Sequence, residues 1–174
     1  DIVSFLHVDG GTFEAANVEA GVTGAASVLV ENGGELDVQS LLLSNFVSYP
    51  ADVLRVAGSG SVAKVDEMYL FGPDQTTARV DGGGELNAGN GQVHIGSAPG
   101  FGFAGVMARL IIEDAGSELN AFSGTVTLGR QGSDHELTIR GQATADVGQF
   151  LQYDGLFLVD NANFSAGEHA FNRG

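Results

Sequence analysis

Short stretches of alternating apolar and polar residues recur along the whole chain, and each one runs into a turn rich in glycine, asparagine or aspartate. An alternation with period two is typical of a β-strand that buries one of its faces. The chain is therefore predicted to consist of a repeated strand–turn–strand unit. The segments that carry this pattern read LHVDGGTFEA, LVENGGELDV, RVAGSGSVAK, RVDGGGELNA, IIEDAGSELNA, TIRGQATADV and LVDNANFSA.

Residues of the same kind occupy the same place in successive repeats. Units stacked about 4.8 Å apart would align such residues into columns of buried aliphatic side chains. The inward pairs expected before the turn are Leu6/Val8, Val28/Val30, Leu54/Val56, Ala78/Val80, Leu110/Ile112, Leu137/Ile139 and Phe157/Val159. Those expected after the turn are Phe13/Ala15, Leu36/Val38, Leu86/Ala88, Leu119/Ala121, Ala145/Val147 and Phe164/Ala166.

The third repeat fits this pattern poorly. Val62 is expected to point inward there, which places Lys64 where Val38 and Ala88 lie in the neighbouring repeats. Two explanations remain open: Val65 replaces Lys64 through a β-bulge, or the register of this repeat differs.

The pattern predicts an all-β fold, a right-handed parallel β-helix of about seven coils that forms a single domain over residues 1–174. Each coil is expected to hold three short strands, because most repeats carry another apolar alternation, at 41–43, 68–70, 93–95 and 126–128. No window has apolar residues at helical spacing behind a capping residue. The alternative is a sandwich of hairpins, for which Asp9-Gly10 and Asp81-Gly82 offer suitable turns.

Neither end of the sequence carries an amphipathic capping helix, and a terminal coil of a solenoid leaves backbone groups and core side chains open. We therefore expect the coils to continue into a partner, either more of a longer chain or another copy stacked end to end. A stack of identical copies would give a homo-oligomer or a filament.

The charge of the chain narrows the possible partners. Its 22 acidic and 7 basic residues give a net charge of −15, which disfavours binding to nucleic acid or to anionic membranes. The few basic residues are scattered along the sequence. The sequence contains no run of about 18 apolar residues, the length that would predict a membrane span. It also contains no cysteine that could form a disulfide or a thiolate metal site.

Two stretches, VDGGGELNAGNGQVHIG at 80–96 and EDAGSELNAFSGTVTLG at 113–129, show the repeat most fully. They resemble the β-strand repeats of bacterial autotransporter passenger domains and of glycine-rich proteins on bacterial surfaces. The resemblance implies a right-handed β-helix located outside the cell or at the cell surface, and it carries over no catalytic residue. The expected function is that of a non-catalytic structural or adhesin-type protein, in a stalk or filament.

The alternatives are a carbohydrate-active β-helix enzyme, such as a polysaccharide lyase or hydrolase, and a carbohydrate-binding module. An enzyme of this kind needs converging carboxylates and a basic residue. Glu14 with Asp37, and Glu85 with Glu118, are expected side by side on outward columns. The paired Asp-Asp, Gly-His-Gly and Arg-Ile-Lys signatures of pectinase-like enzymes are absent. A binding module would align the exposed tyrosines Tyr49, Tyr69 and Tyr153.

Metal chemistry has little support in the sequence. The four histidines, His7, His94, His135 and His169, fall in different repeats without the spacing of zinc ligands. Calcium stays open, because crowded acidic side chains on neighbouring strands repel each other and a hard cation would relieve that repulsion. No catalytic, cofactor-binding or metal-binding residue is assigned.

The repeats lengthen after the third strand, at 44–52, 72–77 and 97–108, and such insertions usually gather on one side of a solenoid. The last of them is apolar. We expect it to lie on its own solenoid, across Leu29 and Ile111, or to contact another subunit. The residues predicted at a subunit contact are Phe101, Phe103 and Met107, with Phe46 and Tyr49 beside them.

Overall fold

The computed structural model describes residues 4–21, 24–45, 52–72, 75–96, 107–129 and 134–171. These residues form two β-sheets and contain no helix. Within them sheet A has seven strands, in the order β1-β3-β5-β7-β10-β12-β14. Their bounds are β1 (Ser4–Asp9), β3 (Ala26–Glu31), β5 (Asp52–Ala57), β7 (Thr76–Asp81), β10 (Ala108–Glu113), β12 (Glu136–Arg140) and β14 (Leu156–Asp160).

Sheet B has eight strands in the described part of the chain. Its order is β15-β13-β11-β8-β6-β4-β2, and β9 lies between β6 and β11 in line with β8. The bounds are β2 (Thr12–Ala20), β4 (Glu35–Ser44), β6 (Val62–Phe71), β8 (Glu85–Asn87), β9 (Gln92–Ile95), β11 (Glu118–Leu128), β13 (Thr144–Gln152) and β15 (Asn163–Phe171).

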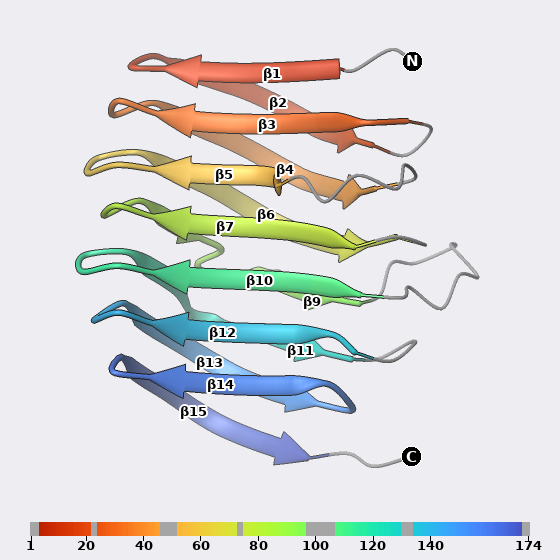
Figure 1. Ribbon diagram of the computed structural model, residues 1–174, viewed down its shortest axis with the longest axis vertical. Helices are drawn as coiled ribbons and strands as arrows, with labels where there is room; N and C mark the ends of the chain where they lie inside the picture. Colours follow the sequence, from red (N-terminus) through yellow and green to blue (C-terminus); the bar gives the residue numbers. More distant parts are fainter. Residues whose placement is uncertain are drawn as a thin grey trace.

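Each strand of sheet A runs through a turn into sheet B, and the chain then returns to the next position in sheet A (Figure 1). We call one strand of sheet A together with the sheet B strand or strands that follow it a unit. All pairings among the described strands are parallel and join successive units, so the alternative of paired hairpins is wrong. The arrangement is consistent with a parallel β-solenoid.

The turn between β3 and β4 illustrates why an Asn-Gly pair does not make a hairpin here. Asn32 and Gly33 both have positive φ angles, of 55° and 77°, and the amide of Gly34 donates to the carbonyl of Glu31 at 2.9 Å. This geometry belongs to a tight two-residue turn. The strands that it joins enter different sheets, so each of them pairs with the next unit instead of with its partner across the turn.

The predicted inward column before the turn is confirmed as a continuous ladder. Each member of this column pairs with the member in the next unit, in the order Val8, Val30, Val56, Val80, Ile112, Ile139 and Val159. The members up to Ile139 are buried, whereas Val159 in the last unit is 40% exposed. The prediction of a buried Val159 is therefore wrong, because no described residue packs on the far side of that unit.

The sequence predicted three short strands in each unit, and the structure merges the last two in most units. In β4 the outward pair Gln39 and Ser40 interrupts the alternation between the inward residues Val38 and Leu41, yet the strand continues. Only the unit of β7, β8 and β9 keeps three separate strands among the described residues, because residues 88–91 leave the ladder.

The register of the third repeat differs from the predicted one. Leu36 pairs with Ala63, and Val38 pairs with Val65; Ala63 and Val65 are buried, whereas Lys64 points outward. The turn of this unit holds one residue more than the turn before it. Its last residue, Ser61, is fully buried, and its hydroxyl accepts a hydrogen bond from the amide of Gly33 at 3.1 Å.

Candidate functional site

Four of the five residues predicted at a subunit contact lie outside the described residues: Phe46, Tyr49, Phe101 and Phe103. The fifth, Met107, is half-buried just before β10, and its carbonyl accepts a hydrogen bond from the amide of Thr76 at 2.9 Å. It borders a shallow depression with Arg109, His135 and Leu156. The predicted contact therefore stays a prediction.

The four arginines among the described residues are scattered in the sequence but gather on the outward face of sheet A. Arg55 binds Asp81 at 2.8 Å, and Arg79 bridges Asp52 of β5 to Glu113 of β10. Arg140 contacts the same Glu113, with 2.8 Å between Nε and Oε2. Arg109 lies 3.1 Å from Glu136. These pairs link neighbouring strands, so they complement the backbone ladder and neutralise carboxylates that would otherwise repel each other.

Glu113 is the centre of this network, and its environment sets the direction of a pH effect. Burial raises the pKa of Glu113, but hydrogen bonds from Arg140 and Arg79 outweigh burial and hold the pKa below its ordinary value of 4.5. A carboxyl whose folded-state pKa is lowered stabilises the fold above its unfolded pKa, and this contribution is lost as the pH falls through the folded pKa.

We expect Glu113→Gln to lower the urea midpoint near pH 7, because Arg79 and Arg140 lose a charged partner. The same variant should lose less stability than the parent when the pH falls below about 4.5. Urea denaturation at several pH values compares the two proteins. Glu168→Gln, on an exposed side chain of β15, is the control, and parallel pH profiles for parent and Glu113→Gln would contradict the assignment.

The outward face of sheet B is strongly acidic, as the sequence predicted. Glu14 pairs with Asp37, and Glu85 pairs with Glu118. Lys64 lies between Asp37 and Asn87 in the same column, and its Nζ is 2.6 Å from a carboxylate oxygen of Glu35. The hydrogen bond to Glu35 raises the pKa of Lys64 above its ordinary value. Lys64 thus relieves part of the repulsion between neighbouring acidic side chains, which was the reason for considering a bound calcium ion in the sequence analysis.

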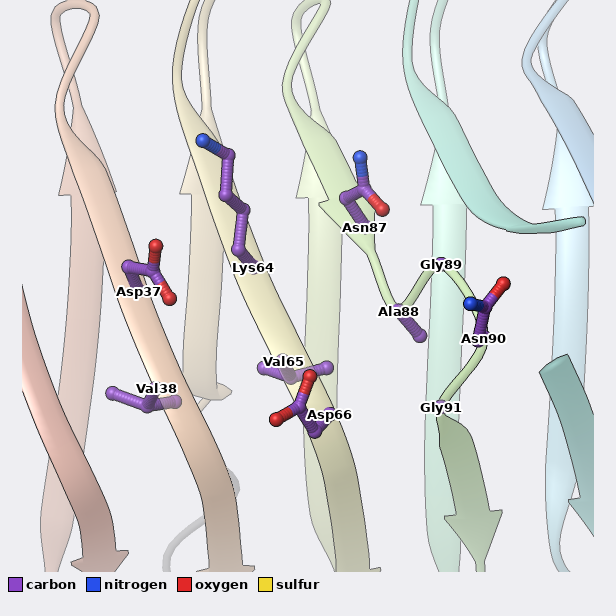
Figure 2. Close-up of a pocket in the computed structure, with 10 residues that line it drawn as sticks. All are labelled: Asp37, Val38, Lys64, Val65, Asp66, Asn87, Ala88, Gly89, Asn90 and Gly91. Atoms are coloured by element: carbon purple, nitrogen blue, oxygen red, sulfur yellow. The ribbon is translucent and has the colours of Figure 1, made fainter. Parts of the chain in front are cut away.

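A shallow depression of about 440 Å³ lies on this face, where the ladder breaks between β8 and β9. Figure 2 shows Asp37, Lys64 and Asn87 on three neighbouring strands, beside the displaced segment with Asn90. A second depression follows Glu14 and Gln39 and shares Asp37 with the first. Together they form a polar trough across the units that precede this segment.

Two inserted residues wall off one end of this trough. The inward residues Ala88 and Val93 are five positions apart, whereas the corresponding Val38 and Leu41 are three apart. The next unit has the same insertion, and the amide of Ser123 there donates to the carbonyl of Gly89 at 3.3 Å. The inserted residues of the two units therefore stack on each other. In the sequence, the inserted residues show as a greater spacing between inward residues in these two repeats, from Ala88 to Val93 and from Ala121 to Val126.

The histidines have separate structural roles. His7 contacts Glu31 at 2.9 Å, and His94 stacks on Tyr69 with ring centroids 4.9 Å apart. His135 is fully buried, and its Nδ1 accepts a hydrogen bond from the amide of Ala108 at 3.1 Å. His169 lies in an aromatic cluster. The described residues contain no group of three or more His, Asp or Glu side chains that could hold a metal ion.

The tyrosines do not form a row in the described part of the chain. Tyr69 is half-buried on sheet B, and its hydroxyl donates to Glu67 at 3.0 Å. Burial and this hydrogen bond raise the pKa of Tyr69 above its ordinary value. Tyr153 lies three units further along, after β13, and Tyr49 lies outside the described residues. The aromatic platform of a carbohydrate-binding module is thus not assembled by Tyr69 and Tyr153.

The last unit exposes inward side chains more than the units before it. In the last unit Phe157 and Phe164 are half-buried, and Phe171 is 70% exposed. They surround the fully buried Phe150 of the preceding unit and His169, which takes the place of an aliphatic residue in the inward column. The sequence alternation did not identify His169 as an inward residue, because polar residues normally mark the outward face.

Comparison with protein-family models, with curated proteins and with solved structures finds no match for this chain. No helix of the described residues could span a membrane.

Proposed function

We propose that this protein is a non-catalytic structural or adhesin-type protein of the cell surface or extracellular space. In this proposal residues 1–174 form a single domain, a right-handed β-helix of about seven coils. The domain assembles end to end into a stalk or filament, or is part of one.

The observation that carries the proposal is the contrast between the interior and the end of the aliphatic columns. Interior members such as Ile112 and Ile139 are fully buried by the units on either side, whereas Val159, the last member of the same column, is 40% exposed. Each unit of a solenoid buries its inward face only against its neighbours. An end that presents this face and unpaired strand edges is suited to continuation.

The enzyme alternative has weaker support. A polysaccharide lyase or hydrolase needs carboxylates that converge with an available acid or base in a groove. On the acidic face the one lysine near the trough, Lys64, is engaged with Glu35. The arginines of sheet A are likewise held by carboxylates on an outward face.

Electron microscopy and sedimentation of the purified 174-residue chain test this function. The expected result is association that grows with protein concentration and produces elongated particles. A monomer that persists at every concentration, with both terminal units ordered in hydrogen exchange, would be evidence against a structural assembly. Incubation with plant and bacterial polysaccharides tests the enzyme alternative in parallel, since release of reducing or unsaturated ends would support it.

A second candidate, glycan binding as an adhesin, is favoured by the free polar groups of the trough. The side chains of Asp37, Asp66 and Asn90 line it and make no hydrogen bond to any described residue. Planar carboxylates and amides of this kind can bind sugar hydroxyls, and the negative charge selects neutral or basic sugars.

We expect the double variant Asp66→Ala with Asn90→Ala to weaken binding of a neutral or amino-sugar oligosaccharide. Each lost hydrogen bond contributes about 1 kcal/mol, which corresponds to roughly fivefold in affinity. Calorimetric titration with the best ligand from a glycan array measures the loss. The control makes the same changes away from the trough, at Asp146 and Asn163, and a similar loss in both variants would exclude the trough as the binding site.

A further inference from the structure

The last unit presents the inward face of the solenoid as an open surface. Val159 is 40% exposed, whereas Ile139, its partner in the preceding unit, is fully buried, and Phe171 at the end of β15 is 70% exposed. The far edges of β14 and β15 pair with no described strand. Figure 1 shows these two strands (blue) at one end of the stack and β1 with β2 (red) at the other.

The first unit presents the complementary face. Its inward residues Leu6, Phe13, Ala15 and Val18 are only partly buried against the core, whereas Val8 and Ala20 are buried. The backbone edges of β1 and β2 that face away from β3 and β4 pair with no described strand. One copy of the chain therefore carries a partly open inward face at its first unit and a more open one at its last. Because the described strands pair in parallel, the strands of each sheet run in the same direction at both ends.

The two end units match each other in the spacing of their inward residues. The first unit has them at positions 6, 8, 13, 15, 18 and 20, and the last unit has them at 157, 159, 164, 166, 169 and 171. Every position of the second set is 151 higher than its counterpart in the first. The unit next to each end has a turn one residue longer, from Val30 to Leu36 and from Ile139 to Ala145. The two ends thus fit each other without any adjustment of turn length.

The outward residues are also compatible in this register. A shift of 151 residues places Leu156 of one copy beside Phe5 of the next, and these side chains are 55% and 59% exposed. Burying two such side chains together is favourable. The same shift places Glu168 beside Asn17, and Ser165 beside Glu14. Asp160 beside Asp9 is the one like-charged pair among the strand residues brought together.

We propose that the last unit of one copy binds the first unit of a second copy, head to tail, in this 151-residue register. The strands β14 and β15 then pair in parallel with β1 and β2 of the next copy, and the inward columns continue across the junction. This inference rests on the proposed structural function and adds to it the partner, the polarity and the register. Because the two contacting surfaces differ, each added copy leaves both open ends in place and the assembly grows into a filament.

The absence of cysteine from the chain makes disulfide cross-linking a direct test of the register. The register places Thr12 beside Asn163, and both side chains are exposed. Adjacent strands lie about 4.8 Å apart, which is within the Cα separation of roughly 4.4–6.8 Å that a disulfide spans. We expect the double variant Thr12→Cys with Asn163→Cys to form a ladder of covalently linked chains under mild oxidation.

The matched control is Thr12→Cys with Ser165→Cys, which carries the same number of thiols on the same face. A displacement of two residues along the strand adds about 6.6 Å, so this pair would lie about 8 Å apart, beyond the reach of a disulfide. Both variants are oxidised at high salt, where repulsion between chains of net charge −15 is screened. Circular dichroism confirms that both remain folded, and non-reducing gels measure the ladder.

A ladder from the first variant and none from the control supports the proposal, and equal ladders would overturn the register. Absence of a ladder, with parent protein that still forms filaments, would overturn the end-to-end contact but leave the structural function standing. Absence of a ladder with parent protein that stays monomeric would overturn both. Phe171→Ser gives an independent readout: the proposal expects weaker association in sedimentation, with a loss of monomer stability of less than about 1 kcal/mol.

Discussion

Replacement of Phe150 by alanine is expected to lower the free energy of unfolding by about 3–5 kcal/mol, the usual cost of removing a large buried aromatic side chain. Phe150 is fully buried, and its ring lies 4.7 Å from that of Phe157 and 5.5 Å from that of Phe164, measured between centroids. The cavity would open beneath the last unit, whose strands pair with described strands on one side only. Urea denaturation followed by circular dichroism measures the loss.

The control is the same substitution at Phe171, in the same aromatic cluster. Its ring contacts His169 with centroids 4.4 Å apart, but the side chain is 70% exposed. Little apolar surface is lost on truncation, so Phe171→Ala should cost less than about 1 kcal/mol. Both variants are measured at low protein concentration, so that association between copies of the chain does not contribute to the measured stability. Equal losses for Phe150→Ala and Phe171→Ala would show that the last unit does not pack as described.

Replacement of Gly84 by alanine is the second change expected to have a large effect, about 1–3 kcal/mol or more, as for other overpacked sites. A Cβ atom at this position would lie 2.5 Å from the carbonyl oxygen of Val56 and 3.2 Å from its Cγ1. The oxygen belongs to the backbone of the neighbouring unit and cannot rotate away. The unit must therefore shift or lose part of its ladder, and thermal unfolding measures the cost.

Gly11 provides the matched control for this change. It occupies the same place in the first unit: its carbonyl accepts from Glu35 at 2.8 Å, as that of Gly84 accepts from Glu118 at 3.0 Å. A Cβ atom at Gly11 meets nothing within 4 Å. We expect Gly11→Ala to change stability by less than about 0.5 kcal/mol. A similar loss in both variants would mean that backbone entropy, and not contact between units, requires these glycines.

Much of the fold could be predicted from the sequence because burial acts on each inward position separately. A pleated strand sends alternate side chains to opposite faces, so Val8, Val30 and Val56 already show in the sequence which face is inside. The pairing of Glu14 with Asp37 and of Glu85 with Glu118 was predicted for the same reason. The local alternation of apolar and polar residues, and the repetition of like residues at like positions, were sufficient to predict that successive units pair in parallel.

One failure of prediction lies where the number of residues in a turn changes. The register of Ala63 depends on one extra turn residue, which the buried Ser61 absorbs through its hydrogen bond to Gly33. That bond joins residues 28 positions apart, and no local pattern reports it. The prediction of a separate third strand holds for β9, whereas in β4 the strand continues through Ser40, which pairs with Asn17 and Glu67 of the neighbouring units.

Some features of the candidate sites could likewise be predicted from the sequence, and others could not. The sequence by itself determined the acidic outward columns and the composition of the apolar insertion. Only the tertiary structure brought Arg79 and Arg140 together on Glu113, placed Lys64 against Glu35, and turned His169 inward. The physical reason is that alternation is imposed on a strand by its own pleat, whereas contacts between stacked units depend on turn lengths that accumulate along the chain.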